Sequence, residues 1–278
     1  MTFDQVQHHI TTFLFSCQRT RSDESSYKMK LSDAIFCAED IIRNRAFRQA
    51  IQLAIQDIKK WKPPVIAREF TPIRRWFSRP RQSIISRISK LLALPPFFPS
   101  GEIGGIIYVL DAGSWTWILW LFALIHGATH CTFIEHNPHT LEINQKLIEE
   151  FGYTKQSTFI VGDACNIPRQ DIKISKSQNL KIYTILLSET ITSDLQTEDF
   201  IPIVAHLKQF LTPNAIIIPQ KFDIQADHQT VTIESKNIDQ ETIKKLQWQK
   251  NYQGKVTLYK DVTLSSWDTP SFFNQRNL

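Results

Sequence analysis

The fold is decided by residues 106–135, IIYVLDAGSWTWILWLFALIHGATHCTFIE. The stretch begins with a short apolar run rich in β-branched residues, which is typical of a buried parallel strand. A turn follows at Asp111–Ser114, where Gly113 can adopt backbone conformations that other residues rarely adopt. A second apolar segment ends at Gly127, a residue type that commonly caps helices, and CTFIE then forms a strand that ends at Glu135. The order strand, turn, helix, strand predicts a βαβ unit, which places ligands at the carboxyl ends of its strands.

The same stretch resembles the first motif of class I S-adenosylmethionine-dependent methyltransferases, an acidic residue followed by a glycine-rich loop. Asp111 and Gly113 match this motif, whereas Trp115 and Trp117 stand at the next two glycine positions. Glu135 matches the acidic residue that binds the ribose hydroxyls of the cofactor in that family. The two indoles could cap the cofactor or fill its pocket. The resemblance assigns the following residues to the binding of S-adenosyl-L-methionine: Asp111, Gly113, Ser114 and Glu135.

Composition sets broad limits. The chain has 278 residues, of which 42% are hydrophobic, enough for one large domain or two smaller ones with a core. The net charge of +5 is compatible with a nucleic acid or an acidic membrane as partner but does not indicate either. The four cysteines are scattered without a CxxC pair, which favours reduced thiols. Reduced thiols indicate a reducing compartment, so we expect a cytoplasmic protein, and the first residues do not resemble a secretory signal.

Residues 106–126 are apolar enough to raise the question of a membrane span. Asp111 lies within them, and a charge is costly inside a bilayer. The turn after Asp111 also divides the run into two shorter segments. We therefore predict a strand and a helix here, and no transmembrane span.

The N-terminal part divides into two segments. Residues 1–28 are mostly polar, and we expect them to be loosely ordered. Residues 29–64 carry apolar side chains at helical spacing and end at two consecutive prolines, which predicts N-terminal helices.

These helices contain a second resemblance, because AEDIIRNRAFRQAI is similar to the helix that precedes the cofactor domain in protein arginine methyltransferases. In that family the arginine binds the carboxylate of the methionine moiety, so the resemblance assigns Arg43 to cofactor binding. The alternative is a solvated Arg43 paired with Asp40 or Glu39. The matching positions are Asp40, Arg43, Phe47, Ala50 and Ile51.

Residues 65–105 form an insertion relative to that family, and its first part interleaves arginines with aromatic side chains. Such a strip can contact an anionic surface, and residues 68–90 are the candidate for a weak contact of this kind. The alternative is a solvated insertion whose aromatic side chains pack on the domain.

A further strand, STFIV, is followed by Gly162, Asp163 and Ala164. In class I methyltransferases this position binds the adenine, which the resemblance assigns to the Asp163 side chain and the Ala164 backbone. The alternative is a plain turn, because Gly-Asp is a common turn pair. The histidines on either side of the preceding strand lack a metal-ligand spacing, so we expect no metal.

Two glutamates follow the next strand, KIYTILLS. Glu189 comes directly after it and Glu198 nine residues later. Arginine methyltransferases carry two glutamates at this spacing. A guanidinium is a planar fork of donors that two carboxylates can grip and align, so the resemblance assigns Glu189 and Glu198 to catalysis. The alternative for Glu198 is an acidic residue that favours a helix start.

Beyond residue 220 the pattern alternates with period two, which predicts antiparallel strands over 221–278. In this region Trp267 matches a tryptophan of the arginine methyltransferases, whereas Ser266 stands at the position of their histidine. The chain is thus predicted to be a Rossmann-like class I methyltransferase sandwich over 106–220, with N-terminal helices and a small C-terminal antiparallel β appendage.

The function that the resemblance implies is methyl transfer from S-adenosyl-L-methionine to a guanidino or other cationic nitrogen. The acceptor would be a protein arginine or a small cationic substrate, and the resemblance is compatible with a homodimer. Two alternatives stay open. One is a non-catalytic binding protein whose cofactor loop is blocked by Trp115 and Trp117. The other is a methyltransferase for small molecules.

Overall fold

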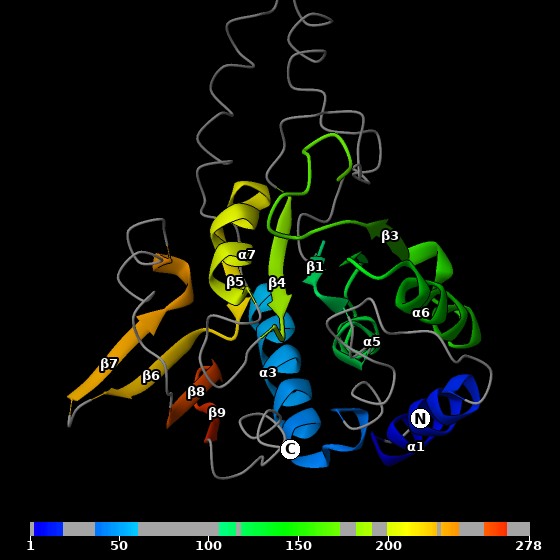
Figure 1. Ribbon diagram of the computed structural model, residues 1–278, viewed down its shortest axis with the longest axis horizontal. Helices are drawn as coiled ribbons and strands as arrows, with labels where there is room; N and C mark the ends of the chain where they lie inside the picture. The colour runs from blue at the N-terminus through cyan, green and yellow to red at the C-terminus, as the bar shows by residue number, and fades with distance from the viewer. Residues whose placement is uncertain are drawn as a thin grey trace, which may run out of the picture.

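The chain folds into a parallel sheet flanked by helices and a second, smaller antiparallel sheet (Figure 1). The computed structural model describes residues 3–18, 37–60, 106–114, 118–172, 182–190, 199–226, 229–238 and 253–265.

The parallel sheet has five strands within these residues, in the order β3-β2-β1-β4-β5. The chain runs outward from β1 to β3 and then returns to the other side of β1 with β4. Ligands of such sheets bind where the order reverses, which here is between β1 and β4. These strands confirm both the predicted βαβ unit and the predicted fold class. Their bounds are β1 (Tyr108–Ala112), β2 (His130–Glu135), β3 (Ser157–Val161), β4 (Tyr183–Ser188) and β5 (Leu211–Ile218).

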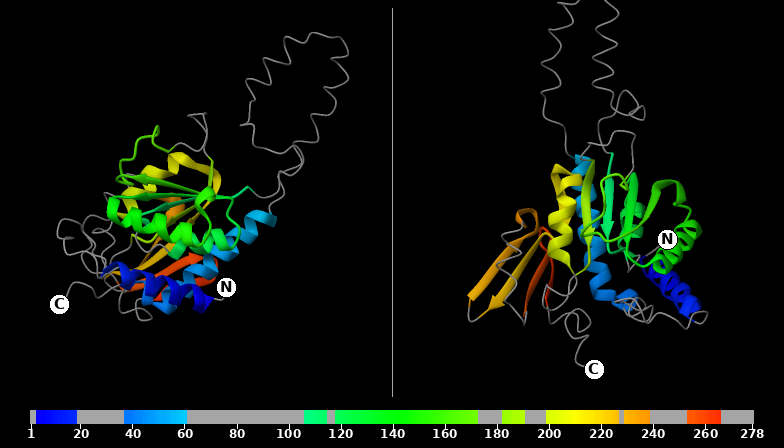
Figure 2. Two further views of the ribbon diagram at one scale, coloured as in Figure 1. Left: turned by 90° about the vertical axis from the view of Figure 1, so that its right-hand side faces the viewer. Right: turned by 45° about the horizontal axis from the view of Figure 1, so that its top comes forward.

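Helices cover both faces of this sheet. The left view of Figure 2 shows the sheet between α7 on one face and α6 on the other. Seven consecutive side chains of α5, from Ile118 to Leu124, are buried, which explains its almost uniformly apolar sequence. Pro138 stands in the first turn of α6, and the Asn137 side chain caps that helix. The helices around the sheet are α3 (Ile41–Lys60), α5 (Ile118–Ile125), α6 (Pro138–Glu150) and α7 (Phe200–Leu207).

The apolar run at 106–126 therefore contains strand β1 and the whole of helix α5. Among the described residues, none of the helices has both the length and the apolar character needed to cross a membrane.

The N-terminus requires a correction, because a loosely ordered stretch was expected over 1–28. The structure instead contains helix α1 (Phe3–Gln18). Phe3, Val6, Ile10 and Leu14 recur at helical spacing and are all buried. The polar residues between them lower the average hydropathy and conceal this stripe. Helix α1 packs against α5 and α6, through the rings of Phe3 and Phe122 among others.

The second sheet is antiparallel, in the order β7-β6-β8-β9, as predicted for the C-terminal appendage. It packs on α3, where the Asp57 carboxylate accepts a 2.9 Å hydrogen bond from the Tyr259 hydroxyl. The Lys260 ammonium pairs with the same carboxylate at 2.5 Å. The strands are β6 (Lys221–Ala226), β7 (Gln229–Glu234), β8 (Gln253–Tyr259) and β9 (Val262–Ser265), and the 3₁₀ turns are η4 (Thr154–Gln156), η5 (Lys208–Phe210) and η6 (Ser235–Asn237).

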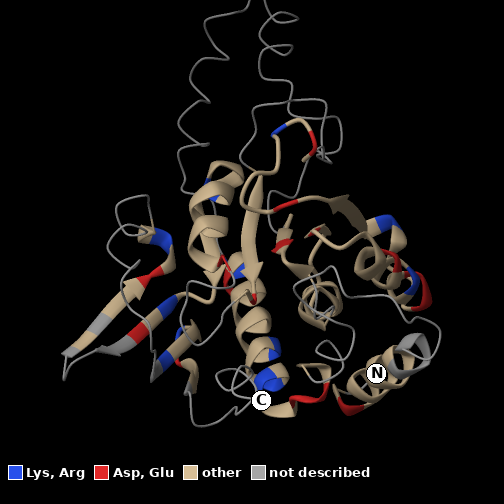
Figure 3. Ribbon diagram, in the orientation of Figure 1, with Lys and Arg blue, Asp and Glu red and all other residues tan. Residues whose placement is uncertain are grey.

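Charged residues of both signs are spread over the ribbon in Figure 3. The basic and aromatic insertion at 65–105, with its candidate surface contact at 68–90, lies outside the described residues. The same holds for Trp115, Trp117, Glu198 and Trp267. Their assignments stay predictions, as does the homodimer.

Candidate active site

Three carboxylates meet at the carboxyl edge of the parallel sheet. Asp111 lies near the end of β1, Glu135 ends β2, and Glu189 directly follows β4. Strand pairing brings them together, because Ala112 is aligned with Ile134 of β2 on one side and with Ser188 of β4 on the other. All three side chains are buried: Asp111 is 2% exposed, Glu135 6%, and the Glu189 side chain 4%.

Helix α3 adds a cation to this group, because the Arg43 guanidinium forms an ion pair with the Glu189 carboxylate. Both side chains are 4% exposed, so the pair is almost wholly removed from solvent. The alternative of a solvated Arg43 is thereby wrong. Burial is the largest influence and by itself lowers the pKa of Arg43. Glu189, Cys37 and Asp40 together outweigh burial and leave that pKa raised, so Arg43 is charged.

Polar neighbours from the N-terminal helices hold Arg43 in place. Its guanidinium donates to the Cys37 carbonyl at 2.8 Å and to the Asn44 side-chain oxygen at 3.3 Å. The Asn44 amide donates in turn to the Ala38 carbonyl at 2.9 Å and to the Gln7 side-chain oxygen at 3.3 Å. Reasoning from the sequence missed Asn44 and Gln7. Asn44 gave only a weak signal, a polar residue next to a matched arginine, and Gln7 gave none.

Burial changes the proton affinity of the two carboxylates that Arg43 does not pair with. It raises the pKa of Asp111 well above its usual range, and the nearby charges of Glu189 and Glu135 raise it further. Burial also raises the pKa of Glu135 to about 7, although the backbone N–H groups of Asn137 and His136 favour its charged form. The Asn137 N–H donates to that carboxylate at 2.8 Å. The edge of the sheet therefore holds two carboxyl groups that Arg43 does not pair with, and burial favours their protonated form in the ligand-free chain.

The turn after β1 packs tightly against the end of β4. Gly113 has a φ of +70° and donates its N–H to the Ile134 carbonyl at 3.0 Å. A Cβ at this position would lie 2.5 Å from Cγ2 of Thr190, so a side chain would meet the segment after β4. Ser114 is 2% exposed, and the Asn144 amide of α6 lies 3.4 Å from its carbonyl and its hydroxyl. Gly113 has no side chain and that of Ser114 is buried, so these two residues of the turn present mainly backbone at the edge of the sheet.

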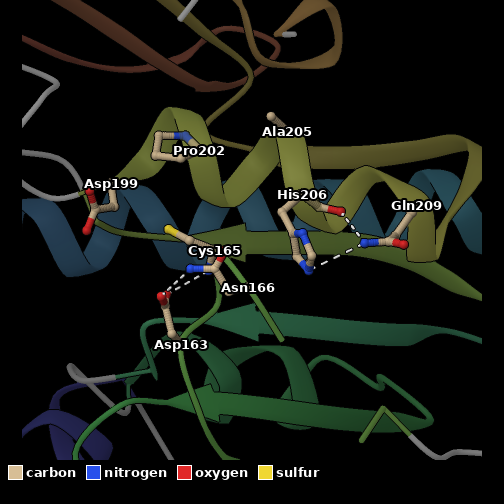
Figure 4. A pocket seen from close by; sticks show the side chains of 8 residues that line it. All are labelled: Asp163, Cys165, Asn166, Asp199, Pro202, Ala205, His206 and Gln209. Carbon is tan, nitrogen blue, oxygen red and sulfur yellow. Dashed lines mark hydrogen bonds between the residues drawn. The ribbon is translucent and has the colours of Figure 1, made fainter. Parts of the chain in front are cut away.

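Asp163 lies apart from the buried carboxylates, in the exposed turn after β3, with Ala164 buried beside it. Its carboxylate accepts hydrogen bonds of 2.8 Å from the Cys165 N–H and the Asn166 side-chain amide. Partial burial raises the pKa of Asp163, but these hydrogen bonds outweigh burial and leave that pKa below its usual value. Asp163 also borders a pocket of about 680 Å³ between this turn and α7 (Figure 4).

The structure therefore brings together Arg43, Asp111, Gly113, Ser114, Glu135 and Glu189. It places Asp163 and Ala164 at the end of the neighbouring strand β3. In the part of the chain that the structure describes, no three His, Cys, Asp or Glu side chains are arranged so that they could hold a metal ion.

Comparisons with known proteins give matches among solved structures alone. No protein-family model and no curated protein matches the chain. A PRMT1 enzyme–prozyme complex of Trypanosoma brucei, solved with S-adenosylhomocysteine, is similar at 21% identity over 44% of this chain and 37% of that chain, with a TM-score of 0.35. Protein arginine methyltransferase 10 of Arabidopsis thaliana is similar at 18% identity over 43% and 31% of the two chains, with a TM-score of 0.36. A PRMT6 structure is similar at 14% identity over 58% and 74%, with a TM-score of 0.45. The chain thus spans well under two thirds of the first two proteins.

Proposed function

We propose that this chain binds S-adenosyl-L-methionine and transfers its methyl group to a cationic nitrogen. One observation carries the proposal, the gathering of Asp111, Glu135 and Glu189 at the reversal point of the sheet, where Glu189 is paired with Arg43. Arg43 is the one buried Lys or Arg within the described residues. Buried carboxylates are stable in their charged form only when paired or hydrogen-bonded. The two carboxyl groups that Arg43 does not pair with therefore favour a ligand that brings positive charge and hydroxyl donors.

The residues of the site fit S-adenosyl-L-methionine on this criterion. Its sulfonium and ammonium groups would offset the carboxylates, and its ribose hydroxyls would donate to Glu135. Its carboxylate would meet the Arg43 guanidinium, which presents a planar fork of donors. Gly113 and Ser114 would border it with backbone, because no side chain projects from the glycine. Asp163 and the Ala164 backbone would hold its adenine.

The cofactor would supply a methyl group on a positively charged sulfur, and S-adenosylhomocysteine would leave as a neutral thioether when the carbon–sulfur bond breaks. The acceptor nitrogen would lose one proton as its bond to the methyl carbon forms, and the Glu189 carboxylate would accept that proton. Glu189 would hold the acceptor by accepting hydrogen bonds from its cationic nitrogen. The contact with Arg43 supports this assignment, because it brings a guanidinium against the Glu189 carboxylate at the buried edge of the sheet. Glu198 would be the second carboxylate of the clamp. Two carboxylates would align one nitrogen of a guanidino group and localise its charge on the others.

The acceptor proposed is a protein arginine or a small guanidino or amino compound. The ion pair also supports a second candidate, a non-catalytic binding domain. If the Arg43–Glu189 ion pair is only structural, neither residue needs to contact a ligand.

The two candidates can be separated by a methyl-transfer assay. The purified chain is incubated with methyl-labelled S-adenosyl-L-methionine and either an arginine-rich peptide or agmatine. We expect labelled acceptor with the wild type and none with Glu189→Gln. The matched control is Glu149→Gln, which changes an exposed glutamate of α6 and should transfer as the wild type does. Transfer by Glu189→Gln at the wild-type rate would remove the acceptor clamp. Cofactor binding without transfer to any cationic acceptor would favour the non-catalytic domain.

A further inference from the structure

The pocket beside Asp163 is larger than an adenine requires. It measures about 680 Å³ and lies between the turn after β3 and helix α7 (Figure 4). Pockets that hold entire drug-sized ligands span about 300–1,000 Å³. The turn contributes Asp163 and Cys165, whereas α7 and the 3₁₀ turn after it contribute Pro202, Ala205, His206 and Gln209.

Hydrogen bonds join the two walls of this pocket. The His206 ring Nε2 donates to the Ile167 carbonyl at 2.9 Å, which links α7 to the segment after β3. The Arg169 Nε donates to the Gln209 side-chain oxygen at 2.7 Å, and the Gln209 amide donates to the His206 carbonyl at 3.0 Å. These contacts fix the spacing of the walls, so the pocket is a built feature of the fold.

Asp163 connects this pocket to the proposed cofactor site. Its carboxylate is oriented by the Cys165 N–H and the Asn166 amide, one on each oxygen. Each carboxylate oxygen can accept a further hydrogen bond, so Asp163 can still accept an N–H from a ligand. A singly alkylated amino group keeps one such N–H. Pro202 and Ala205 offer apolar surface to an alkyl or aryl substituent on that nitrogen.

We propose that this pocket accommodates substituents on the exocyclic amino nitrogen of adenine, so that the chain accepts N6-alkylated forms of its cofactor. The inference rests on the proposed function, because it requires the adenine to bind at Asp163. It goes beyond that function because it assigns a specificity. Asp163 recognises the amino nitrogen of adenine, and the pocket beside it tolerates substituents on that nitrogen.

The experiment is isothermal titration of the full chain with S-adenosylhomocysteine and with N6-benzyl-S-adenosylhomocysteine. We expect the two dissociation constants to agree within about fivefold, less than the tenfold that corresponds to about 1.4 kcal/mol. Binding of the parent compound with a benzyl derivative weaker by about 100-fold or more would overturn this inference and leave the proposed function intact. Absence of binding by both compounds would overturn the proposed function and the inference together.

A variant of the pocket gives an independent test. Ala205→Phe fills the pocket from α7 and should weaken the benzyl derivative by about tenfold or more, without changing the affinity for S-adenosylhomocysteine. Retained binding of the parent compound shows that the variant is folded. The matched control is Ala205→Ser, which keeps the small side chain and should bind both compounds as the wild type does. Equal affinity of Ala205→Phe for both compounds would contradict the assignment of the pocket.

Discussion

Arg43 and Glu189 form a buried ion pair that joins helix α3 to the end of strand β4, with each side chain 4% exposed. The family resemblance assigns Arg43 to the cofactor and Glu189 to the acceptor. Their contact shows that the two parts of the candidate site are adjacent. It also places helix α3 against the carboxyl edge of the sheet, although that helix precedes the first strand.

The ion pair should be measurable as a coupling in stability. Removing one partner of a buried pair leaves an uncompensated charge and typically costs about 3–5 kcal/mol. Arg43→Met and Glu189→Gln should therefore each lower the free energy of unfolding by about this amount. The double variant should lose much less than the sum, because it buries neither charge. Urea unfolding of the four proteins gives the coupling. Additive losses would show that the two residues do not stabilise each other.

Glycine is required at position 113 because its φ is positive and because a Cβ there would collide with Thr190. Gly113→Ala should destabilise the fold by about 2 kcal/mol or more and weaken S-adenosylhomocysteine binding, because the strain of a positive φ adds to a collision with Thr190. The matched control is Gly152→Ala after α6, where φ is +76° but no atom lies within 4 Å of the added Cβ. The control should cost about 1 kcal/mol and leave binding unchanged. Thermal unfolding and calorimetry measure both effects. Equal losses of stability in the two variants would exclude a special role for the space around Gly113.

The stability of the ligand-free chain should depend on pH through Glu135. Its pKa of about 7 in the folded protein lies above the 4.5 of an unperturbed glutamate, so the folded state binds the additional proton between these values. This contribution to stability is fully present below pH 4.5 and is lost as the pH rises through about 7. Glu135→Gln should remove that loss. The measurement is the free energy of unfolding of both proteins from pH 4.5 to 8, and parallel profiles would contradict the raised pKa.

Much of the sheet and part of the site can be predicted from local sequence. Asp111 and Glu135 each end an apolar run, so strand periodicity alone places their carboxylates at one edge. Gly113 is predictable because a sharp turn must follow a buried strand that leads into a helix. The Arg43–Glu189 pair is different, since it depends on how α3 packs against the sheet. Its two residues are suggested only by the family resemblance.

Helix α1 and the placement of the appendage could not be predicted for related reasons. The apolar stripe of α1 is interrupted by polar residues, and the helix gains its stability by burying that stripe against α5 and α6. Asp57 holds the appendage on α3. It contacts Tyr259 and Lys260, which lie far from it in the sequence. A hydrogen bond or an ion pair between such distant residues has no periodic signature.

The most direct test of the account is a calorimetric titration of the purified full chain with S-adenosylhomocysteine and S-adenosyl-L-methionine. We expect binding in the micromolar range, about −8 kcal/mol, and an affinity lower by about tenfold or more in Glu135→Gln. Absence of binding at millimolar ligand would contradict it. The buried carboxylates at the edge of the sheet would then have to be explained by a role other than cofactor binding.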